Sequence, residues 1–221
     1  MEKKIDCLTV GGLQTNCWLY YLEDDGQKSC AVIDPGDEAE LIISRLRELD
    51  WVPRYILLTH GHLDHLAALP DLIAAYWKSG PKTGIHRLDT NYIGKDSLKI
   101  HRDSFSATGG NPAFVDALWK PMPKADLLFE EGETVGPFKV LHSPGHSPGS
   151  AAFYDEKTGV LFSGDTLFRG NWGRTDLPGG NEAQIFRSLK RLISMEKETV
   201  VCPGHGPATT IGEEAGLLEN L

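Results

Sequence analysis

The sequence predicts an α/β protein in which helices cover the outer faces of β-sheets. Short apolar runs with the length of strands occur in both halves of the chain, and segments with helical periodicity lie between them. Strands mixed with helices in this way favour sheets that are covered on their outer faces. The 221 residues allow one large domain or two small ones, and 40% hydrophobic residues suffice for a sizeable core.

The first half of the chain predicts three strands and two helices. Residues 17–22, 31–33 and 55–58 are apolar and of strand length, and residues 23–28 predict a polar turn. Asp37 and Glu40 have the spacing of a capping box, in which two side chains satisfy the first N–H groups of a helix. Apolar residues then follow at helical spacing: Leu41, Ile42, Leu46 and Leu49. The second helix is expected over residues 66–76.

The second half repeats this arrangement. Strands are expected over residues 140–142, 151–154, 160–162 and 199–202. One helix face is formed by Ile185, Leu189, Leu192 and Ile193. Residues 87–125 are polar, rich in Gly, Asn and Pro, and weakly patterned. We interpret them as an insertion or lid, with a passive surface excursion as the alternative.

The segment 60–65 reads His-Gly-His-Leu-Asp-His, so it places three imidazoles and a carboxylate within six positions. Imidazole and carboxylate are the ligands that metals such as zinc prefer. A hydrogen-bonded core histidine explains one such residue, but it does not explain three histidines beside an aspartate. The segment follows a predicted strand and precedes a predicted helix. It therefore predicts a metal site on a strand-to-helix turn.

Three later turns each place a ligand-type residue beside glycine, after a predicted strand. They contain His146, Asp165 and His205. Glycine lets the backbone turn sharply and approach closely. Asp165 alone would be read as a turn-stabilising residue, but the recurrence of such turns favours ligands. Three further histidines have no motif and are expected in structural roles: His86, His101 and His142.

These segments together resemble metallo-β-lactamase-fold hydrolases, most closely the short glyoxalase II-like (hydroxyacylglutathione hydrolase-like) branch. The matching segments are residues 15–17, 33–36, 60–65, 173–180 and 209–213, with the turns of His146, Asp165 and His205. The resemblance implies a four-layer αββα sandwich of two mixed β-sheets flanked by helices. It further implies a single domain over residues 1–221, in which we see no match around residues 89–121.

Carried over to this chain, the resemblance implies two metal ions. His60, His62 and His146 would bind the first ion. Asp64, His65 and His205 would bind the second, with Asp165 bridging both. Asp64 and Asp165 are the expected catalytic carboxylates, and Asp34 is expected to brace the site. We expect two divalent ions, zinc first, although iron and manganese accept the same ligands.

The implied chemistry is hydrolysis of a thioester of the S-2-hydroxyacylglutathione type by a metal-bound hydroxide. A thiolate with a conjugate-acid pKa of about 8.5 leaves without a strong general acid. The expected substrate contacts are Arg174, Arg169 and Trp172, which follow Asp165 in the sequence. Arg174 has an alternative role as the ion-pair partner of Asp176.

Other activities fit part of the pattern. A persulfide dioxygenase of this fold would use one iron, held by His60 or His62 with His146 and Asp165. A lactonase or β-lactamase is a weaker alternative, because fold does not determine substrate. A metal-binding protein without turnover is a third. The complete ligand set for two ions favours the hydrolase.

Composition narrows the partners and the compartment. A net charge of -9 argues against nucleic acid or an anionic membrane as partner, and the expected partner is a small acyl-thiol. Residues 1–4 lead into a strand-like segment instead of a secretory leader, and no apolar run has the length of a membrane span. The cysteines form no C-x-x-C pair: Cys7, Cys17, Cys30 and Cys202. We therefore expect reduced thiols and a cytoplasmic protein. The sequence indicates no oligomeric state.

Overall fold

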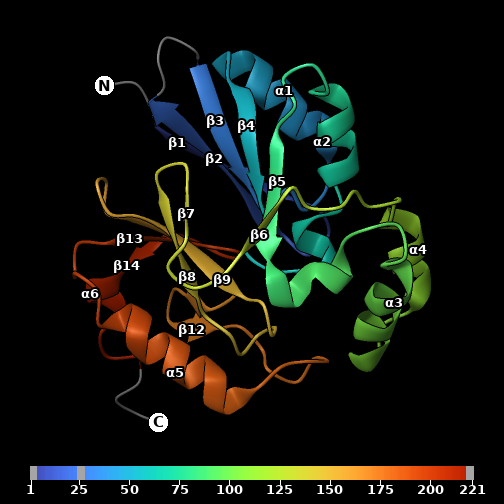
Figure 1. Cartoon of the computed structure of the whole chain (residues 1–221). Helices are drawn as coiled ribbons and strands as arrows, with labels where there is room; N and C mark the ends of the chain where they lie inside the picture. Colours follow the sequence, from blue (N-terminus) through green and yellow to red (C-terminus); the bar gives the residue numbers. More distant parts are fainter. Residues whose placement is uncertain (1–3, 24–27, 218–221) are drawn as a thin grey trace.

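A computed structural model describes residues 4–23 and 28–217 as two six-stranded sheets packed face to face, with helices outside them (Figure 1). The predicted turn over residues 23–28 falls mainly on residues 24–27, which lie outside the described residues. Within the described part of the chain, no helix is long and apolar enough to cross a membrane.

The first sheet has the strand order β1-β2-β3-β4-β5-β6. Its strands are β1 (Ile5–Val10), β2 (Thr15–Glu23), β3 (Lys28–Ile33), β4 (Val52–Leu57), β5 (Lys82–His86) and β6 (Leu127–Phe129). Strands β1 to β3 are antiparallel neighbours, whereas β3 to β6 run parallel to one another. The parallel strands end at one edge of the sheet, where the metal-ligand loop after β4 begins.

The second sheet has the order β14-β13-β10-β9-β8-β7. Its strands are β7 (Thr134–Val135), β8 (Phe138–His142), β9 (Ala151–Asp155), β10 (Val160–Gly164), β13 (Val200–Pro203) and β14 (Thr209–Thr210). Only β10 and β13 are parallel in this sheet as described. A small hairpin of β11 (Leu167–Phe168) and β12 (Asn171–Trp172) follows β10.

The inner core lies between the two sheets. Ile33 and Leu57 project from the first sheet, and Phe138 and Phe162 from the second; all four are fully buried. The rings of Phe138 and Phe162 meet edge to face, with centroids 5.8 Å apart. Such edge-to-face pairs add about 0.5–1.5 kcal/mol to the burial of their surface.

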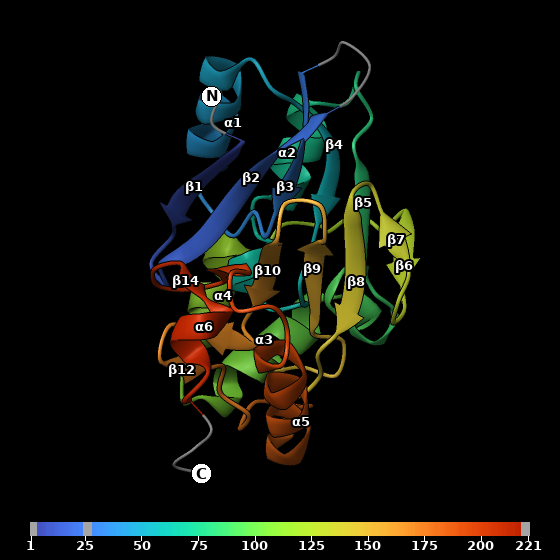
Figure 2. The same ribbon diagram turned by 90° about the vertical axis from the view of Figure 1, so that its left-hand side faces the viewer.

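Helices complete the outer layers. Helices α1 (Ala39–Leu49) and α2 (Leu69–Ala75) pack on the first sheet, and α5 (Glu182–Ile193) packs on the second. Helices α1 and α5 lie on opposite sides of the molecule in both views (Figure 1 and Figure 2). The short elements η1 (Leu63–His65) and α6 (Ile211–Glu214) complete the connections. The predicted four-layer αββα arrangement is confirmed.

One local prediction was wrong at the start of α1. The helix is capped by Glu38 in a left-handed conformation and has no side-chain cap, so Asp37 and Glu40 form no capping box. The Asp37 carboxylate instead accepts a hydrogen bond from Glu38 N. Leu41 is 44% exposed, because the buried face is formed by Ile42, Ile43 and Leu46. The second helix begins at Leu69, later than expected, after the 3₁₀ turn of η1.

Residues 87–125 are more regular than their composition suggests. They form η2 (Arg87–Tyr92), α3 (Leu98–Ala107) and α4 (Pro112–Leu118). Asn111 begins α4 as a side-chain cap, and Pro112 occupies its first turn. Helices α3 and α4 pack against each other through the stacked rings of Phe105 and Phe114, 5.0 Å apart.

Candidate metal centre

Seven residues predicted as ligands come together at the edge where the parallel strands end. The loop after β4 and the following η1 carry His60, His62, Asp64 and His65. The turns after β8, β10 and β13 carry His146, Asp165 and His205, respectively. The structure therefore gathers residues that are up to 145 positions apart in the sequence.

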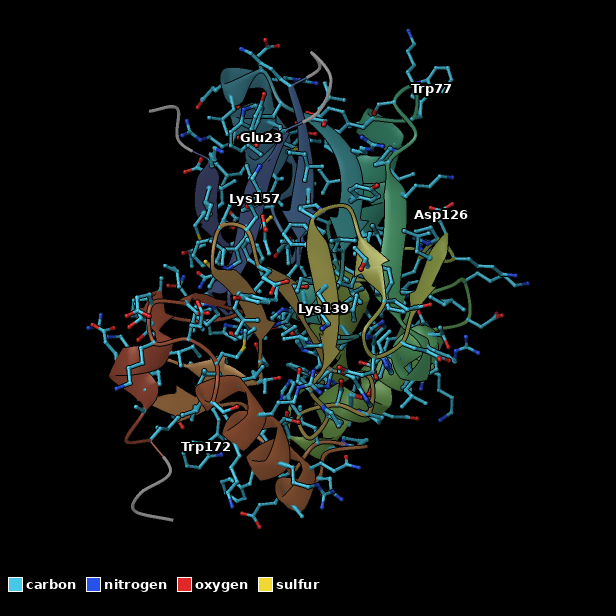
Figure 3. The ribbon with its side chains drawn as sticks, turned by 60° about the vertical axis from the view of Figure 1, so that its left-hand side comes forward. Glu23, Trp77, Asp126, Lys139, Lys157 and Trp172 are labelled. Carbon is cyan, nitrogen blue, oxygen red and sulfur yellow. The ribbon has the colours of Figure 1, made fainter. Side chains whose placement is uncertain are left out.

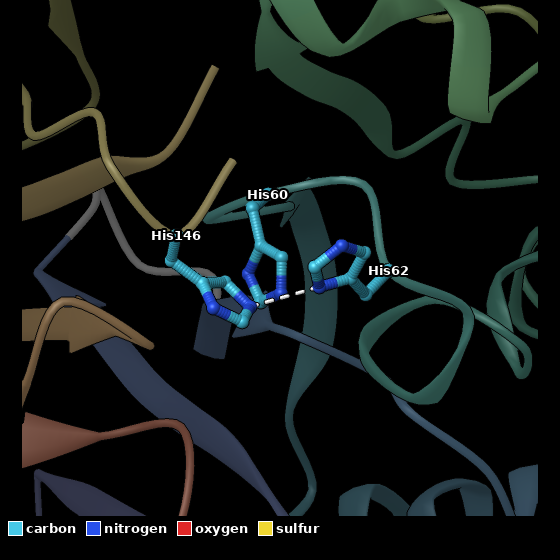
Figure 4. A group of neighbouring side chains, drawn as sticks. All are labelled: His60, His62 and His146. Atoms are coloured by element: carbon cyan, nitrogen blue, oxygen red, sulfur yellow. Dashed lines mark hydrogen bonds between the residues drawn. The ribbon is translucent and has the colours of Figure 1, made fainter. Parts of the chain in front are cut away.

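The first group consists of His60, His62 and His146, whose ligand atoms all lie within 4.8 Å of one another. Figure 4 shows the three rings converging, with His62 Nδ1 2.8 Å from His146 Nε2. Burial and the neighbouring imidazoles hold the pKa of His60 and His62 well below the ordinary value. Both rings are therefore neutral at pH 7, which is the form that binds a metal.

The second group consists of Asp64, His65 and His205. Asp64 Oδ2 lies 3.5 Å from His65 Nε2 and 3.4 Å from His205 Nε2. Burial disfavours a charged His65, but the surrounding carboxylates of Asp165, Asp64 and Asp34 raise its pKa to about 10. Burial alone would raise the pKa of Asp64, but His65 and His205 lower it well below its usual range. The pocket thus attracts positive charge strongly.

Asp165 lies between the two groups. Its Oδ2 is 3.5 Å from His146 Nε2 of the first group and 3.5 Å from His205 Nε2 of the second. Its Oδ1 is 3.4 Å from His65 Nε2. One carboxylate therefore reaches both sets of ligands, as a bridging ligand would.

The chemistry of these atoms fits metal ions. Among the described residues, His60 Nε2 and Asp165 Oδ1 are buried ligand-type atoms that make no hydrogen bond. Buried polar atoms without partners are rare and destabilising in proteins. Space is also kept for Asp165, because a Cβ atom at Gly204 would lie 2.2 Å from its Oδ1. A metal ion would satisfy these atoms.

A second layer of polar groups orients the histidines. Asp34 Oδ2 accepts a 2.6 Å hydrogen bond from Thr59 Oγ1 and lies 3.0 Å from His65 Nδ1. Thr59 Oγ1 in turn lies 3.1 Å from His60 Nδ1. His146 Nδ1 is 2.8 Å from the carbonyl oxygen of Arg174. Partners on the far ring nitrogen select the tautomer whose Nε2 is free for a metal.

Three supporting residues had no predicted role. Thr15 Oγ1 donates to Asp64 Oδ2 over 3.1 Å, and Asn16 Nδ2 donates to the carbonyl oxygens of Pro203 and Gly206, on either side of His205. Residues 15–17 belonged to the resemblance, which was the available signal. The third is Asp89, a fully buried carboxylate in η2 that no sequence motif indicated.

Of the three expected substrate contacts, only Arg174 lines the cavity beside the metal centre in the described part of the chain. The unpredicted His101 also lines this cavity. The Arg174 guanidinium binds both carboxylate oxygens of Asp176, which is the alternative role expected for it. Trp172 and Arg169 are not among the described residues that line this cavity. Trp172 packs against Phe186 of α5, and Figure 3 shows it at the far end of the molecule from Glu23.

Comparison with protein families matches residues 10–205 to the metallo-beta-lactamase superfamily. The chain belongs to this superfamily. The match extends beyond the ligands themselves, because it begins in β1 and ends at His205. The gathered His and Asp side chains agree with a metal-dependent hydrolase of this superfamily.

Individual superfamily members align along nearly the whole chain. Hydroxyacylglutathione hydrolase GloC of Haemophilus influenzae is 35% identical over 214 residues, covering 95% of this chain and 94% of the relative. The crystal structure of TTHA1623 in a di-iron-bound form superposes with a TM-score of 0.79 at 39% identity, covering 98% and 100% of the two chains. BLEG-1 B3 metallo-beta-lactamase superposes with the same TM-score at 34% identity, covering 95% of each chain.

Proposed function

We propose that this protein uses two divalent metal ions to hydrolyse acyl-thiols. These substrates are thioesters, the class to which S-2-hydroxyacylglutathione belongs. The observation that carries the proposal is Asp165, whose carboxylate lies within 3.5 Å of nitrogens in both ligand groups. The 35% identity to a hydroxyacylglutathione hydrolase supports the substrate class. Zinc is the first ion to test, with iron next because a 39% identical neighbour is described as di-iron-bound.

The ions, when bound, would supply an activated water and polarise the substrate carbonyl. The protein positions their ligands. Thr15 holds the Asp64 carboxylate, Asp34 orients His65, and the Arg174 carbonyl orients His146. Because these side chains are held in place before the substrate binds, they need not reorganise during the reaction, as in other preorganised sites. No serine or cysteine nucleophile is required.

The cysteines are free thiols, as expected for a protein in a reducing compartment. Cys17, Cys30 and Cys202 are free and buried, and burial raises the pKa of each thiol. Buried thiols with raised pKa values are poor nucleophiles, so they act as small core residues. This usage fits the cytoplasm that we propose as the location.

The test is hydrolysis by protein reconstituted with zinc, iron or manganese. Release of free thiol from S-lactoylglutathione and from lactoyl-N-acetylcysteamine is followed with a chromogenic thiol reagent. The proposal predicts metal-dependent turnover of at least one thioester, lost on chelation and in Asp165→Ala. Protein that binds two ions and cleaves neither these nor simpler acetyl thioesters would exclude the proposed function.

A further inference from the structure

The cavity beside the metal centre has one wall of metal ligands and one apolar wall. It has a volume of about 440 Å³. Helices α3 and α4 supply Phe105, Phe114 and Val115, and the segments facing them supply Leu13, Leu63 and Leu177. A cavity of this size holds a small organic molecule and buries most of its surface.

Lys and Arg side chains are scarce in this cavity. Arg174 is the one Lys or Arg among its described lining residues. Both oxygens of Asp176 bind it, through Nε and Nη2 at 2.7 Å each. The neighbouring cations of α3 are also paired, Lys99 with Asp103 and Arg102 with Asp116. A carboxylate on a substrate would therefore compete with an existing carboxylate for each of these cations.

The remaining polar groups on the helical side are uncharged: the hydroxyls of Ser104 and Thr108 and the imidazole of His101. His101 is 2% exposed and lies 2.8 Å, through Nε2, from the carbonyl oxygen of Tyr92. Burial lowers its pKa to about 4. Nε2 therefore carries the hydrogen and donates a hydrogen bond to the Tyr92 carbonyl oxygen, which leaves Nδ1 as an acceptor. His101 contributes no positive charge for an anionic substrate.

We propose that this cavity selects an uncharged acyl-thiol whose acyl group is apolar and packs beneath α3 and α4, in preference to a glutathione thioester. This inference rests on the proposed function and narrows its substrate. Glutathione carries two carboxylates, which lose hydration near the cavity without gaining an unpaired Lys or Arg side chain. An apolar acyl group is stabilised by burying its surface against the leucines and phenylalanines.

A binding measurement with ligands that cannot be hydrolysed tests this inference independently of catalysis. The metal-loaded protein is titrated by calorimetry with two stable thioethers, S-benzyl-N-acetylcysteamine and S-benzylglutathione, which share the apolar group and cannot be hydrolysed. We expect the uncharged thioether to bind about tenfold more tightly, a difference of about 1.4 kcal/mol. Equal or tighter binding of the glutathione thioether would overturn the inference.

Variants of Phe114 in α4, with a control in β6, test whether the apolar wall determines the binding preference. Phe114→Ala removes an apolar wall residue and should weaken the uncharged thioether several-fold. The matched control is Leu128→Ala, since Leu128 is also a partly exposed apolar residue, at 46%, but lies outside the cavity. Phe114→Arg adds a free cation and should shift the preference towards S-benzylglutathione. Circular dichroism verifies folding, and an unchanged preference in both Phe114 variants would contradict the proposed wall.

Turnover distinguishes the two proposals. If the loaded protein cleaves no thioester, the proposed function fails, while the thioether titration still decides what the cavity prefers. If it cleaves S-lactoylglutathione more efficiently than N-acetylcysteamine thioesters with lactoyl and hexanoyl groups, the proposed function stands and the inference about the cavity falls. The inference predicts the highest kcat/KM for the hexanoyl compound.

Discussion

The carboxylate of Asp89 accepts a 2.7 Å hydrogen bond from Ser147 Oγ, although the two residues are 58 positions apart. It also accepts hydrogen bonds from Gly61 N and Gly149 N, over 3.0 and 2.7 Å. Gly61 separates His60 from His62, and Ser147 follows His146. One fully buried side chain therefore joins the two loops that carry the first ligand group.

Asp89→Asn should weaken binding of the first ion. The amide retains one acceptor oxygen, but its NH₂ group faces a donor that the carboxylate had satisfied. We expect a loss of about 10–100-fold in metal affinity and of about 1–3 kcal/mol in the free energy of unfolding. Competition with a chromogenic chelator and urea denaturation measure the two effects. Asp103→Asn, an exposed change on α3, is the control. Wild-type affinity in Asp89→Asn would contradict this role.

Asp165→Ala should lower activity far more than Arg174→Ala. Asp165 reaches both ligand groups, so its loss should exceed the roughly 100-fold effect of removing a supporting residue. The Arg174 side chain is paired with Asp176, and only its backbone carbonyl contacts His146. Its truncation should change kcat/KM by a few-fold. Comparable losses in the two variants would show that Asp165 does not bridge.

Asp34→Asn should weaken both ion sites together. Asp34 contacts His65 directly and His60 through Thr59. Loss of the carboxylate removes the groups that select the ring tautomers, at a cost of about 10–100-fold in affinity. Titration with zinc should show both steps shifted, whereas the control Asp37→Asn, at a partly buried position outside the ligand groups, should titrate like the wild type. Weakening of a single step would limit Asp34 to one site.

The apo protein should lose stability as pH falls from about 6.5 to about 4. Burial and the stacked ring of His142 lower the pKa of His86 to about 4, from an ordinary value of 6.5. Within that interval the unfolded chain binds more protons than the folded one, so acid favours unfolding. His86→Asn removes this proton and retains an acceptor for Leu88 N.

Urea denaturation of the apo protein at several pH values tests this sign. The variant should show a shallower fall than the wild type, by up to about 1.4 kcal/mol per pH unit for one proton. His101 and the ligand histidines titrate in both proteins, so the difference isolates His86. Parallel curves would exclude His86 as a source of acid sensitivity.

The ligand turns were predictable because their residue types are rare and their chemistry is specific. His146, Asp165 and His205 each follow a strand, and parallel strand ends meet at one edge. Asp89 was not predictable in this way, since its partners come from two distant loops. A lone aspartate in a polar segment has no sequence feature that reveals burial.

The helices of residues 87–125 escaped prediction for a related reason. The buried face of α3 carries His101 and Ser104, and that of α4 carries only Val115. Helical periodicity is detected through apolar residues, so a polar face that lines a cavity leaves little pattern. The polar residues that obscure the helical pattern include His101, which lines the cavity as an uncharged polar group.

The metal content of the purified protein, measured by elemental analysis after saturation with zinc or iron and removal of excess, tests the central claim most directly. The arrangement of two ligand groups around Asp165 predicts close to two ions per chain, and fewer in Asp165→Ala. A single ion per chain under saturating conditions would contradict the two-ion centre. If that ion were iron, the result would favour the mononuclear oxygen chemistry that the first ligand group and Asp165 could also support.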